Sequence, residues 1–234
     1  MPTLIVPDHI GFILDGNRRF AKLRGLRPWR GHEFGKKKVQ QLLDWCGEFG
    51  VKELTLYTFS MQNFGRPKEE VDKIMELIEK SVDEFIDDER IHKQGIRIKV
   101  IGHVEMLPQS VQAAIRRAEE ATKNYSNFTL NLCIAYGGKE EIFSAAKMLI
   151  KKVLEKAIDL KDITLESFES QLQLQSEPDL IIRTGGEHRT SNFLSWQSGY
   201  SEWFFVKKLL PDFNKQDFQN ILTEYADRER RFGK

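Results

Sequence analysis

The sequence predicts an α/β fold in which a mostly parallel central β-sheet is flanked by helices, in a single domain that spans residues 1–234. Short apolar runs alternate with longer amphipathic stretches, and this alternation is typical of strand–helix units around a parallel sheet. No repeat, low-complexity tract or Pro/Gly/Ser-rich linker divides the chain. A domain of 234 residues buries about 70% of the surface of its unfolded chain, so it needs no disulfide or metal for stability.

The expected strands are short apolar runs bounded by turn residues or polar residues. The first, residues 9–14, ends at the tripeptide Asp15-Gly16-Asn17, which is typical of a turn. The other expected strands follow in chain order at residues 53–59, 96–101, 128–136, 180–183 and 203–206.

The expected helices have apolar residues at steps of three and four. In residues 33–50 this spacing runs from Val39 to Phe49, and Gly50 favours a helix end. Pro67 opens a second long helix, whose apolar stripe runs from Val71 to Ile86. The remaining expected helices lie at residues 111–121, 140–154, 192–197 and 216–230.

The overall composition excludes several classes of protein. The 36 Lys and Arg minus the 35 Asp and Glu give a net charge of +1, which argues against a dedicated nucleic-acid binder. No apolar run approaches the roughly 20 residues of a transmembrane helix, and the first residues do not have the pattern of a signal peptide. Cys46 and Cys133 both lie in apolar stretches, as buried thiols in a reducing compartment do. We therefore expect a cytoplasmic protein.

Three polar clusters follow expected strands, at residues 15–19, 60–66 and 183–192. In an open parallel sheet, ligands bind at the carboxyl ends of the strands. If the three strands share one edge of the sheet, the clusters form one site.

The clusters have the residues of two anion sites. Between Arg18 and Lys38 there are nine Lys or Arg and one acid, although a solvated helix face or an RNA contact would also produce such a run. Arg183 and Arg189 flank glycines, which let backbone N–H groups approach phosphate oxygens. Together with Asp15, two anion sites indicate two phosphorylated substrates and a hard metal such as Mg²⁺. The Walker phosphate loop, the dinucleotide-binding glycine pattern and zinc-ligand spacing are all absent from the sequence.

Sequence blocks along nearly the whole chain resemble the cis-prenyltransferases, the undecaprenyl diphosphate synthase family. The blocks are His9-Ile10-(x)4-Asp15-Gly16-Asn17-Arg18-Arg19-Phe20-Ala21, Gly31-His32-(x)2-Gly35, residues 54–67, Asn131 through Tyr136-Gly137-Gly138, residues 179–193 and the tail 227–233. Such enzymes condense isopentenyl diphosphate with an allylic prenyl diphosphate, which gives a longer chain with cis double bonds. The resemblance also implies an apolar tunnel for that chain.

The resemblance implies a role for each matching residue. Asp15 would act with Mg²⁺ on the departing diphosphate, Glu202 would be the second metal carboxylate, and Asn63 would take part in proton removal. The allylic diphosphate would be bound by Gly16, Asn17, Arg18, Arg19, Arg27 and His32. Isopentenyl diphosphate would be bound by Arg183, Arg189 and Ser191. The remaining residues expected at the substrates are Phe20, Ser60, Gln62, Phe64, Arg66 and Thr190.

The resemblance extends to partners. It implies a homodimer, in which the C-terminal Arg231-Phe232-Gly233 reaches the partner's site. A transient contact with the membrane surface would help to release the product, and no nucleic acid is expected as a partner.

Three alternatives stay open from the residues. Gln62 stands where the family usually has Glu, so the acceptor could be unusual or the joining of prenyl groups not head-to-tail. A non-catalytic subunit of a hetero-oligomeric prenyltransferase would resemble the family, but such subunits lose the Asp-Gly-Asn site that is present here. A phosphotransferase with Asp15 as nucleophile would need Asp at position 17, where Asn17 stands.

Overall fold

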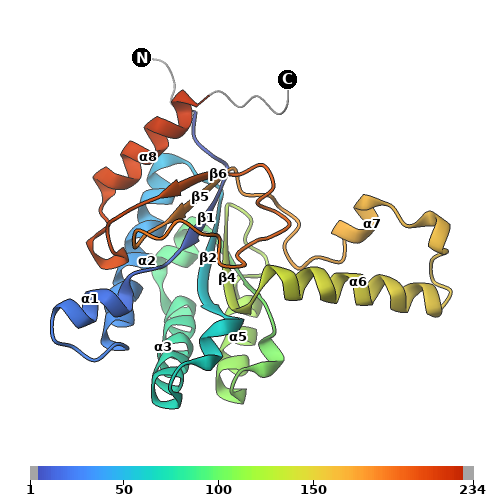
Figure 1. Cartoon of the computed structure of the whole chain (residues 1–234), viewed down its shortest axis with the longest axis horizontal. Coiled ribbons are helices and arrows are strands. Elements are labelled where there is room, and N and C mark those ends of the chain that lie inside the picture. The colour runs from blue at the N-terminus through green and yellow to red at the C-terminus, as the bar shows by residue number, and fades with distance from the viewer. Residues whose placement is uncertain (1–4, 229–234) are drawn as a thin grey trace.

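The computed structural model describes residues 5–228, and its centre is a six-stranded β-sheet. The strands are β1 (His9–Ile13), β2 (Glu53–Ser60), β3 (Ile96–Ile101), β4 (Phe128–Tyr136), β5 (Leu180–Arg183) and β6 (Glu202–Phe205), in the order β3-β4-β2-β1-β5-β6 (Figure 1). Every pair of neighbouring strands is parallel. The predicted fold class is confirmed, and the carboxyl ends of all six strands lie at one edge of the sheet.

Eight α-helices lie in the described part of the chain. They are α1 (Asn17–Leu23), α2 (Arg30–Phe49), α3 (Lys68–Asp87), α4 (Glu89–Gln94), α5 (Gln109–Thr122), α6 (Gly138–Leu154), α7 (Leu165–Glu169) and α8 (Lys215–Asp227). Short 3₁₀ turns lie at η1 (Met61–Gly65), η2 (Val104–Met106), η3 (Leu160–Asp162) and η4 (Leu210–Asp212). Figure 1 shows α6 and α7 projecting from the body as an arm.

The two faces of the sheet pack against different layers. Because side chains alternate along a strand, Phe12 and Leu56 point to one face, whereas Ile13 and Tyr57 point to the other. The first face packs against the apolar residues of α2, α3, α5 and α8. The second packs against Leu174, the Phe193 ring and their neighbours, so the loop that follows β5 covers that face.

One predicted helix is wrong. Residues 192–197 form turns, because Asn192 and Leu194 have φ values of 63° and 44°, which no right-handed helix accommodates. Hydrogen bonds hold this backbone in place: Asn192 accepts from the N–H of Lys139 through its side chain and from the N–H of Gly138 through its carbonyl, both at 2.8 Å.

Other differences concern short elements and boundaries. The sequence pattern did not predict α1, α4 or α7, which have seven, six and five residues and are too short to show helical periodicity. Strand β6 begins one residue earlier than predicted, and α2 begins three residues earlier. Helix α8 ends at Asp227, because Arg228 has an extended backbone. Residues 229 and 230 of the predicted helix, like the tail Arg231-Phe232-Gly233, lie outside the described residues.

Candidate active site

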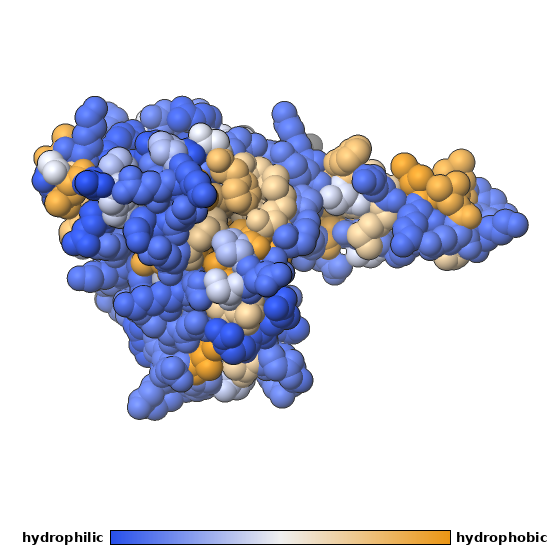
Figure 2. Space-filling model, turned by 90° about the horizontal axis from the view of Figure 1, so that it is seen from below, coloured by the Kyte–Doolittle hydropathy of each residue, from blue (hydrophilic) through white to orange (hydrophobic). Residues whose placement is uncertain are grey.

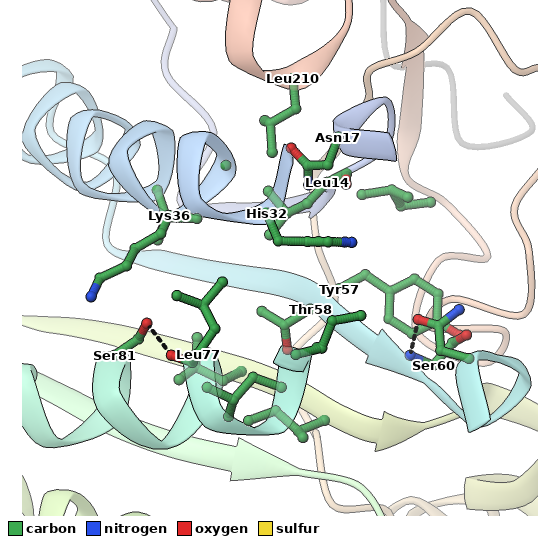
Figure 3. Close-up of a pocket in the computed structure, with 18 of the residues that line it drawn as sticks. Leu14, Asn17, His32, Lys36, Tyr57, Thr58, Ser60, Leu77, Ser81 and Leu210 are labelled. Atoms are coloured by element: carbon green, nitrogen blue, oxygen red, sulfur yellow. Dashed lines mark hydrogen bonds between the residues drawn. The ribbon is translucent and has the colours of Figure 1, made fainter. Parts of the chain in front are cut away.

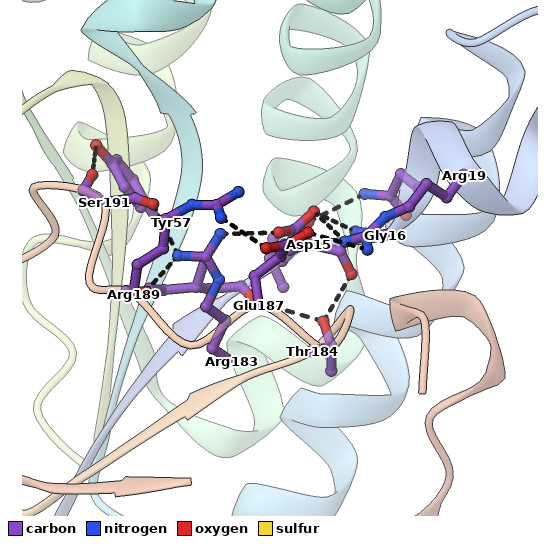
Figure 4. A network of polar contacts seen from close by, with 12 residues as sticks. Asp15, Gly16, Arg19, Tyr57, Arg183, Thr184, Glu187, Arg189 and Ser191 are labelled. Carbon is purple, nitrogen blue, oxygen red and sulfur yellow. Dashed lines mark hydrogen bonds and ion pairs between the residues drawn. The ribbon is translucent and has the colours of Figure 1, made fainter. Parts of the chain in front are cut away.

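The three polar clusters lie together at the carboxyl edge of the sheet, as predicted. Strands β2, β1 and β5 are adjacent, and residues 60–66, 15–19 and 183–192 follow them. Figure 4 shows side chains from the clusters at residues 15–19 and 183–192 in one network of polar contacts. The parallel strand order thus brings residues that are about 170 positions apart into contact, such as Asp15 and Arg183 at 2.9 Å between carboxylate and guanidinium.

Asp15 is the centre of this network. One carboxylate oxygen accepts a hydrogen bond from Arg183, and the other lies 3.2 Å from Arg19 Nη2 and 2.6 Å from the backbone nitrogen of Gly16. Burial alone would raise the pKa of Asp15, but the hydrogen bond and charge of Arg183 and the charge of Arg19 outweigh burial and lower it. Asp15 is therefore ionised at neutral pH.

Arg183 is held rigidly although it carries a charge in the interior. Its residue is 4% exposed, and Nη1 donates to Ser191 Oγ at 2.7 Å and to the backbone carbonyl of Arg189. Its Nε is buried without a hydrogen-bond partner among the described residues. A guanidinium fixed in this way offers directed donors to an oxyanion.

Two glycines allow the backbone around Asp15 to lie close to Leu209 and Arg19. Gly16 has a φ of 107°, and a Cβ atom there would lie 2.9 Å from the Cα of Leu209. Gly185 has a φ of 91°, and a Cβ atom there would lie 2.5 Å from Arg19 Nη2. Any other residue would displace either the turn or Arg19.

His32 and Asn17 lie side by side where α1 meets α2. Gly31 and Gly35 have no side chains, so α2 packs directly against Asn17. His32 Nε2 and Asn17 Oδ1 are both buried without a hydrogen-bond partner in residues 5–228. Burial, with the charges of Arg66 and Arg18, lowers the pKa of His32 to about 4. A neutral imidazole therefore lies at the cavity at pH 7 (Figure 3).

The polar edge opens into a cavity of about 650 Å³ between α2, α3 and the sheet. Predicted site residues line its polar part: Asp15, Asn17, His32, Ser60, Gln62, Asn63, Arg66, Arg183, Arg189 and Ser191. Apolar side chains from the helices and strands line the rest, including Val39, Ile74, Leu77, Ile78, Val82, Phe85, Leu132, Ile134 and Leu210. The arrangement suits a ligand with an anionic head and a hydrocarbon body.

A sequence profile of the family described as putative undecaprenyl diphosphate synthase matches residues 13–233. The chain belongs to the undecaprenyl diphosphate synthase family. Two archaeal relatives are tritrans,polycis-undecaprenyl-diphosphate synthases described as geranylgeranyl-diphosphate specific. The one from Pyrococcus abyssi is 47% identical over 98% of this chain and 88% of its own length. The one from Methanocaldococcus jannaschii is 47% identical over 98% of this chain and 83% of its own.

Solved structures lead to the same family. Lavandulyl diphosphate synthase from Lavandula x intermedia, in complex with dimethylallyl diphosphate, has a TM-score of 0.91 and 36% identity over 98% of this chain and 99% of that one. A probable undecaprenyl diphosphate synthase from Campylobacter jejuni has a TM-score of 0.79 and 35% identity over 97% and 99%. The protein is thus a cis-prenyltransferase that condenses isopentenyl diphosphate with an allylic prenyl diphosphate.

Several predicted site residues of this cis-prenyltransferase do not line the cavity. Phe20 is buried against Phe34, with ring centroids 5.1 Å apart, and Arg27 is exposed and paired with Glu69. The other predicted residues outside the lining are Gly16, Arg18, Arg19, Phe64, Thr190 and Glu202. Gly16 and Arg19 still contact Asp15, whereas the Phe64 ring packs on Phe59.

Glu202 is not brought to Asp15 within one chain. It is the first residue of β6 and is in register with Leu180, which is in register with Ile10. Asp15 lies five residues beyond Ile10, and at about 3.3 Å per residue this places the two carboxylates roughly 16 Å apart along the strands. Glu202 is instead paired with Arg228 at 2.6 Å. A single chain therefore does not bring the two expected metal carboxylates together, and the metal role of Glu202 stays a prediction.

Asp15 still fits a Mg²⁺ ion that arrives with a substrate. No group of three or more His, Cys, Asp or Glu in residues 5–228 is arranged to hold a metal without other ligands. Mg²⁺ is commonly held by one or two carboxylates together with substrate phosphates, and an ionised Asp15 beside an anion site supplies such a carboxylate.

Sequence reasoning missed several lining residues. Lys36, Val39 and Gln40 on α2 line the cavity, as do Tyr57 and Thr58 on β2. Steps of three and four on α2 pointed to a buried face, but periodicity does not tell a core residue from a residue at a cavity. On the apolar side, Leu132, Ile134 and much of the 71–86 stripe line the cavity, whereas Leu130 is buried outside the lining.

Proposed function

We propose that the enzyme binds both diphosphate groups around Asp15 and Arg183 and places the hydrocarbon chain in the cavity between α2 and α3. The observation that carries this proposal is the direct junction of a cationic, polar mouth with an apolar interior. A prenyl diphosphate has the same two parts. The apolar part stabilises the hydrocarbon by keeping water away from it.

The allylic diphosphate is held beside Asn17 and His32. The neutral imidazole donates an N–H to a diphosphate oxygen, and this donor has no partner among the described residues before substrate binds. Gly16 lets the turn after β1 pack against Leu209. Arg19 and Arg18 supply positive charge at the entrance. When the allylic carbon–oxygen bond breaks, charge develops on the leaving diphosphate, and donors already in place stabilise it.

The diphosphate of isopentenyl diphosphate binds at Arg183, Arg189 and Ser191. Arg183 Nε is a buried donor without a partner in the described chain, which supports an oxyanion ligand close by. Arg189 is exposed, and its ion pair with Glu187 at 2.6 Å lies at the entrance. Glu187 would release Arg189 to the substrate.

Mg²⁺ on Asp15 would neutralise charge on the leaving diphosphate. Asn63 orients the acceptor rather than acting as a base, because a carboxamide does not take up a proton at neutral pH. Its Oδ1 accepts from the Ser60 N–H at 3.1 Å, so its NH₂ group is the part left to the substrate. The isopentenyl carbon forms the new carbon–carbon bond, and the proton that is lost goes to a phosphate oxygen.

We propose a twenty-carbon allylic primer, as in the printed names of the archaeal relatives. The cavity lining on α3 runs from Ile74 to Asp88, about 21 Å at 1.5 Å per residue. One isoprene unit has four backbone bonds and spans about 5 Å when extended, by scaling from about 3.6 Å for a three-bond peptide unit. The lining is therefore long enough for about four units.

One experiment tests the reaction and the primer together. Purified protein is incubated with Mg²⁺, labelled isopentenyl diphosphate and allylic diphosphates of five to twenty carbons, and product masses are measured. We expect the highest kcat/KM with the twenty-carbon primer and products that grow by five-carbon units. Equal use of all primers would contradict the primer assignment, and no incorporation with any primer would contradict the reaction.

Two observations also make the coupling of two allylic units a candidate reaction. Gln62 stands where the family usually has Glu, and the lavandulyl diphosphate synthase structure contains dimethylallyl diphosphate. A control with dimethylallyl diphosphate alone therefore accompanies the panel. A ten-carbon product in that control would favour coupling of two allylic units over chain elongation.

We also propose that two copies of the chain associate through the α6–α7 arm. Large apolar side chains are exposed on it, with Phe143 at 65% and Leu154 at 77% (Figure 2). The others on the arm are Met148, Ile150, Leu160 and Leu165. An apolar surface of this kind marks an interface, and a second copy is the partner that the family resemblance implies. No helix among the described residues is long and apolar enough to span a bilayer, and product release at a membrane surface stays a prediction.

A further inference from the structure

The end of the cavity that lies away from the diphosphate site is polar. Lys36 on α2 and Glu84 on α3 both line it, and Lys36 Nζ lies 2.5 Å from Glu84 Oε2. Figure 3 shows Lys36 and Ser81 on the side of the cavity that is remote from Ser60. Between the two ends the lining is mainly apolar, so a growing hydrocarbon chain meets charge at both ends of its path.

This pair differs from the other polar groups at that end. Ser81 Oγ donates to the Leu77 carbonyl at 2.6 Å within α3, and Asp88 is paired with Arg90 at 2.6 Å. Within residues 5–228, Lys36–Glu84 is the one ion pair that joins α2 to α3, the two helices that enclose the cavity.

The burial of the pair places it at the boundary of the cavity. The Lys36 side chain is 20% exposed and the Glu84 side chain is 43% exposed. The methylene groups of Lys36 therefore extend the apolar wall, while its ammonium group and the Glu84 carboxylate separate the cavity from solvent.

We propose that the Lys36–Glu84 ion pair closes the cavity and limits the length of the product. The proposal rests on the proposed function, because it assumes that the chain grows into this cavity. New units are added at the diphosphate end, so the far end of the chain advances toward the pair. From Ile74 to Glu84, α3 advances about 15 Å, the length of roughly three extended isoprene units. A twenty-carbon primer therefore already reaches the pair, whereas a ten-carbon primer reaches it after about one addition.

The limit has a simple physical origin. A chain that reaches the pair must either displace water from two charged groups or separate them and extend past α2 and α3 into solvent. Charged groups lose hydration in the first case, and apolar surface is exposed to water in the second. Each further unit is therefore disfavoured relative to release of the product.

Three variants test the pair directly. Lys36→Met keeps the apolar length of the side chain and removes the charge, and Glu84→Lys places two like charges opposite each other. The exchange Lys36→Glu with Glu84→Lys restores a pair of reversed polarity. The matched control is Lys73→Met, which removes an exposed lysine of α3 that is paired with Glu76 at 2.8 Å and does not line the cavity.

Products are separated by mass after incubation with labelled isopentenyl diphosphate and a ten-carbon primer, and each distribution is normalised to total incorporation. For Lys36→Met and Glu84→Lys we expect the ratio of each long product to the next shorter one to rise roughly two- to fivefold, as loss of a partly exposed ion pair predicts. With the ten-carbon primer the change should begin after about one addition, when the chain reaches the pair. The exchanged pair and Lys73→Met should retain the wild-type distribution.

The outcomes separate the two proposals. Incorporation with unchanged lengths in Lys36→Met and Glu84→Lys overturns the limit and leaves the proposed function standing. Longer products in the exchanged pair as well would mean that side-chain shape, not the ion pair, sets the length, and would also overturn it. If the wild type incorporates nothing with any primer of five to twenty carbons, the proposed function fails and the limit fails with it. Unfolding temperatures of all variants exclude a general loss of structure.

Discussion

Asp15 is partly buried and yet ionised, although burial by itself favours the neutral form of a carboxyl group. Arg183 and Arg19 make this possible by compensating the charge that burial would otherwise suppress. A substrate diphosphate that binds to Arg183 must compete with the carboxylate of Asp15, and a Mg²⁺ ion would remove that competition. The residue is therefore expected to matter for the reaction far more than for the fold.

Asp15→Asn should lower kcat by at least about 100-fold, because a neutral amide does not hold a metal ion at the leaving diphosphate. Adding EDTA to the wild type should have the same effect, and excess Mg²⁺ should reverse it. Steady-state kinetics measures both, and circular dichroism checks the fold. Full activity in EDTA would contradict the magnesium assignment.

His32 should make the stability of the protein depend on pH. Its pKa in the folded protein is about 4, compared with 6.5 in the unfolded chain, so the unfolded state binds more protons between these values. The contribution is fully present above pH 6.5 and is lost as the pH falls toward 4. At pH 5 the loss is about 2 kcal/mol.

Urea unfolding at pH 7.5 and pH 5 measures this effect in the wild type and in His32→Gln. The wild type should lose about 2 kcal/mol more than the variant over this interval. Burial also lowers the pKa of His9, but His9 is present in both proteins and cancels in the comparison. Equal losses would show that His32 is not held neutral.

At the scale of elements, the loop after β5 depends on the first turn of α6. Asn192 Nδ2 donates to Glu140 Oε2 at 2.7 Å, while its Oδ1 accepts from the Lys139 N–H. These bonds hold Ser191 and Asn192 at φ values of 52° and 63°, which residues other than glycine rarely adopt. Helix α6 thereby positions Ser191 against Arg183.

Asn192→Ala should raise the KM for isopentenyl diphosphate more than the KM for the allylic primer. The variant loses the three side-chain hydrogen bonds of Asn192 and places alanine at a strained φ, at a cost of about 1–3 kcal/mol. Glu140→Gln keeps an acceptor for Asn192 and should have a small effect. Kinetics with each substrate varied in turn, together with thermal unfolding, distinguishes loss of position from loss of stability. Equal KM changes for both substrates would contradict this role of the loop.

At the scale of the whole molecule, the arm is difficult to explain in a monomer. Figure 1 shows α6 and α7 extending away from the sheet, and large apolar side chains on them, such as Phe143 and Leu154, remain exposed to water. A second copy that covers the arm would remove this cost. The arm is also joined to the active site, because the first turn of α6 holds the loop that contains Ser191 and Asn192.

Phe143→Asp combined with Leu154→Glu should shift the protein from dimer to monomer, because charges would be buried at the interface. Analytical ultracentrifugation should show a dissociation constant at least about tenfold higher, since two apolar anchors are lost. Leu23→Glu is the matched control, because Leu23 is 76% exposed on α1, on the opposite side of the molecule from the arm. A wild type that is monomeric at micromolar concentration would contradict the dimer.

Much of the architecture is encoded locally. Strands such as residues 53–59 and the long helix after Pro67 follow from apolar spacing, because the periods of a strand and of a helix differ. The three polar clusters could be assigned to one edge for the same reason, since parallel strands all end on the same side. The expected roles of Asp15, Arg183 and His32 came from the resemblance to the cis-prenyltransferases, because the spacing of residues does not assign roles.

Other features depend on contacts between distant parts of the chain. The turns at 192–197 replace a predicted helix because hydrogen bonds from α6, fifty residues earlier, hold Asn192 at a positive φ. Glu202 matches a family motif in sequence, but the register of β6 places it at the amino edge, away from Asp15. The meeting of Lys36 with Glu84 is decided by how α2 and α3 pack on the sheet. The local spacing of apolar residues predicts which face of a helix or strand is buried. The residues that this face contacts depend on how the elements pack, because those residues come from distant parts of the chain.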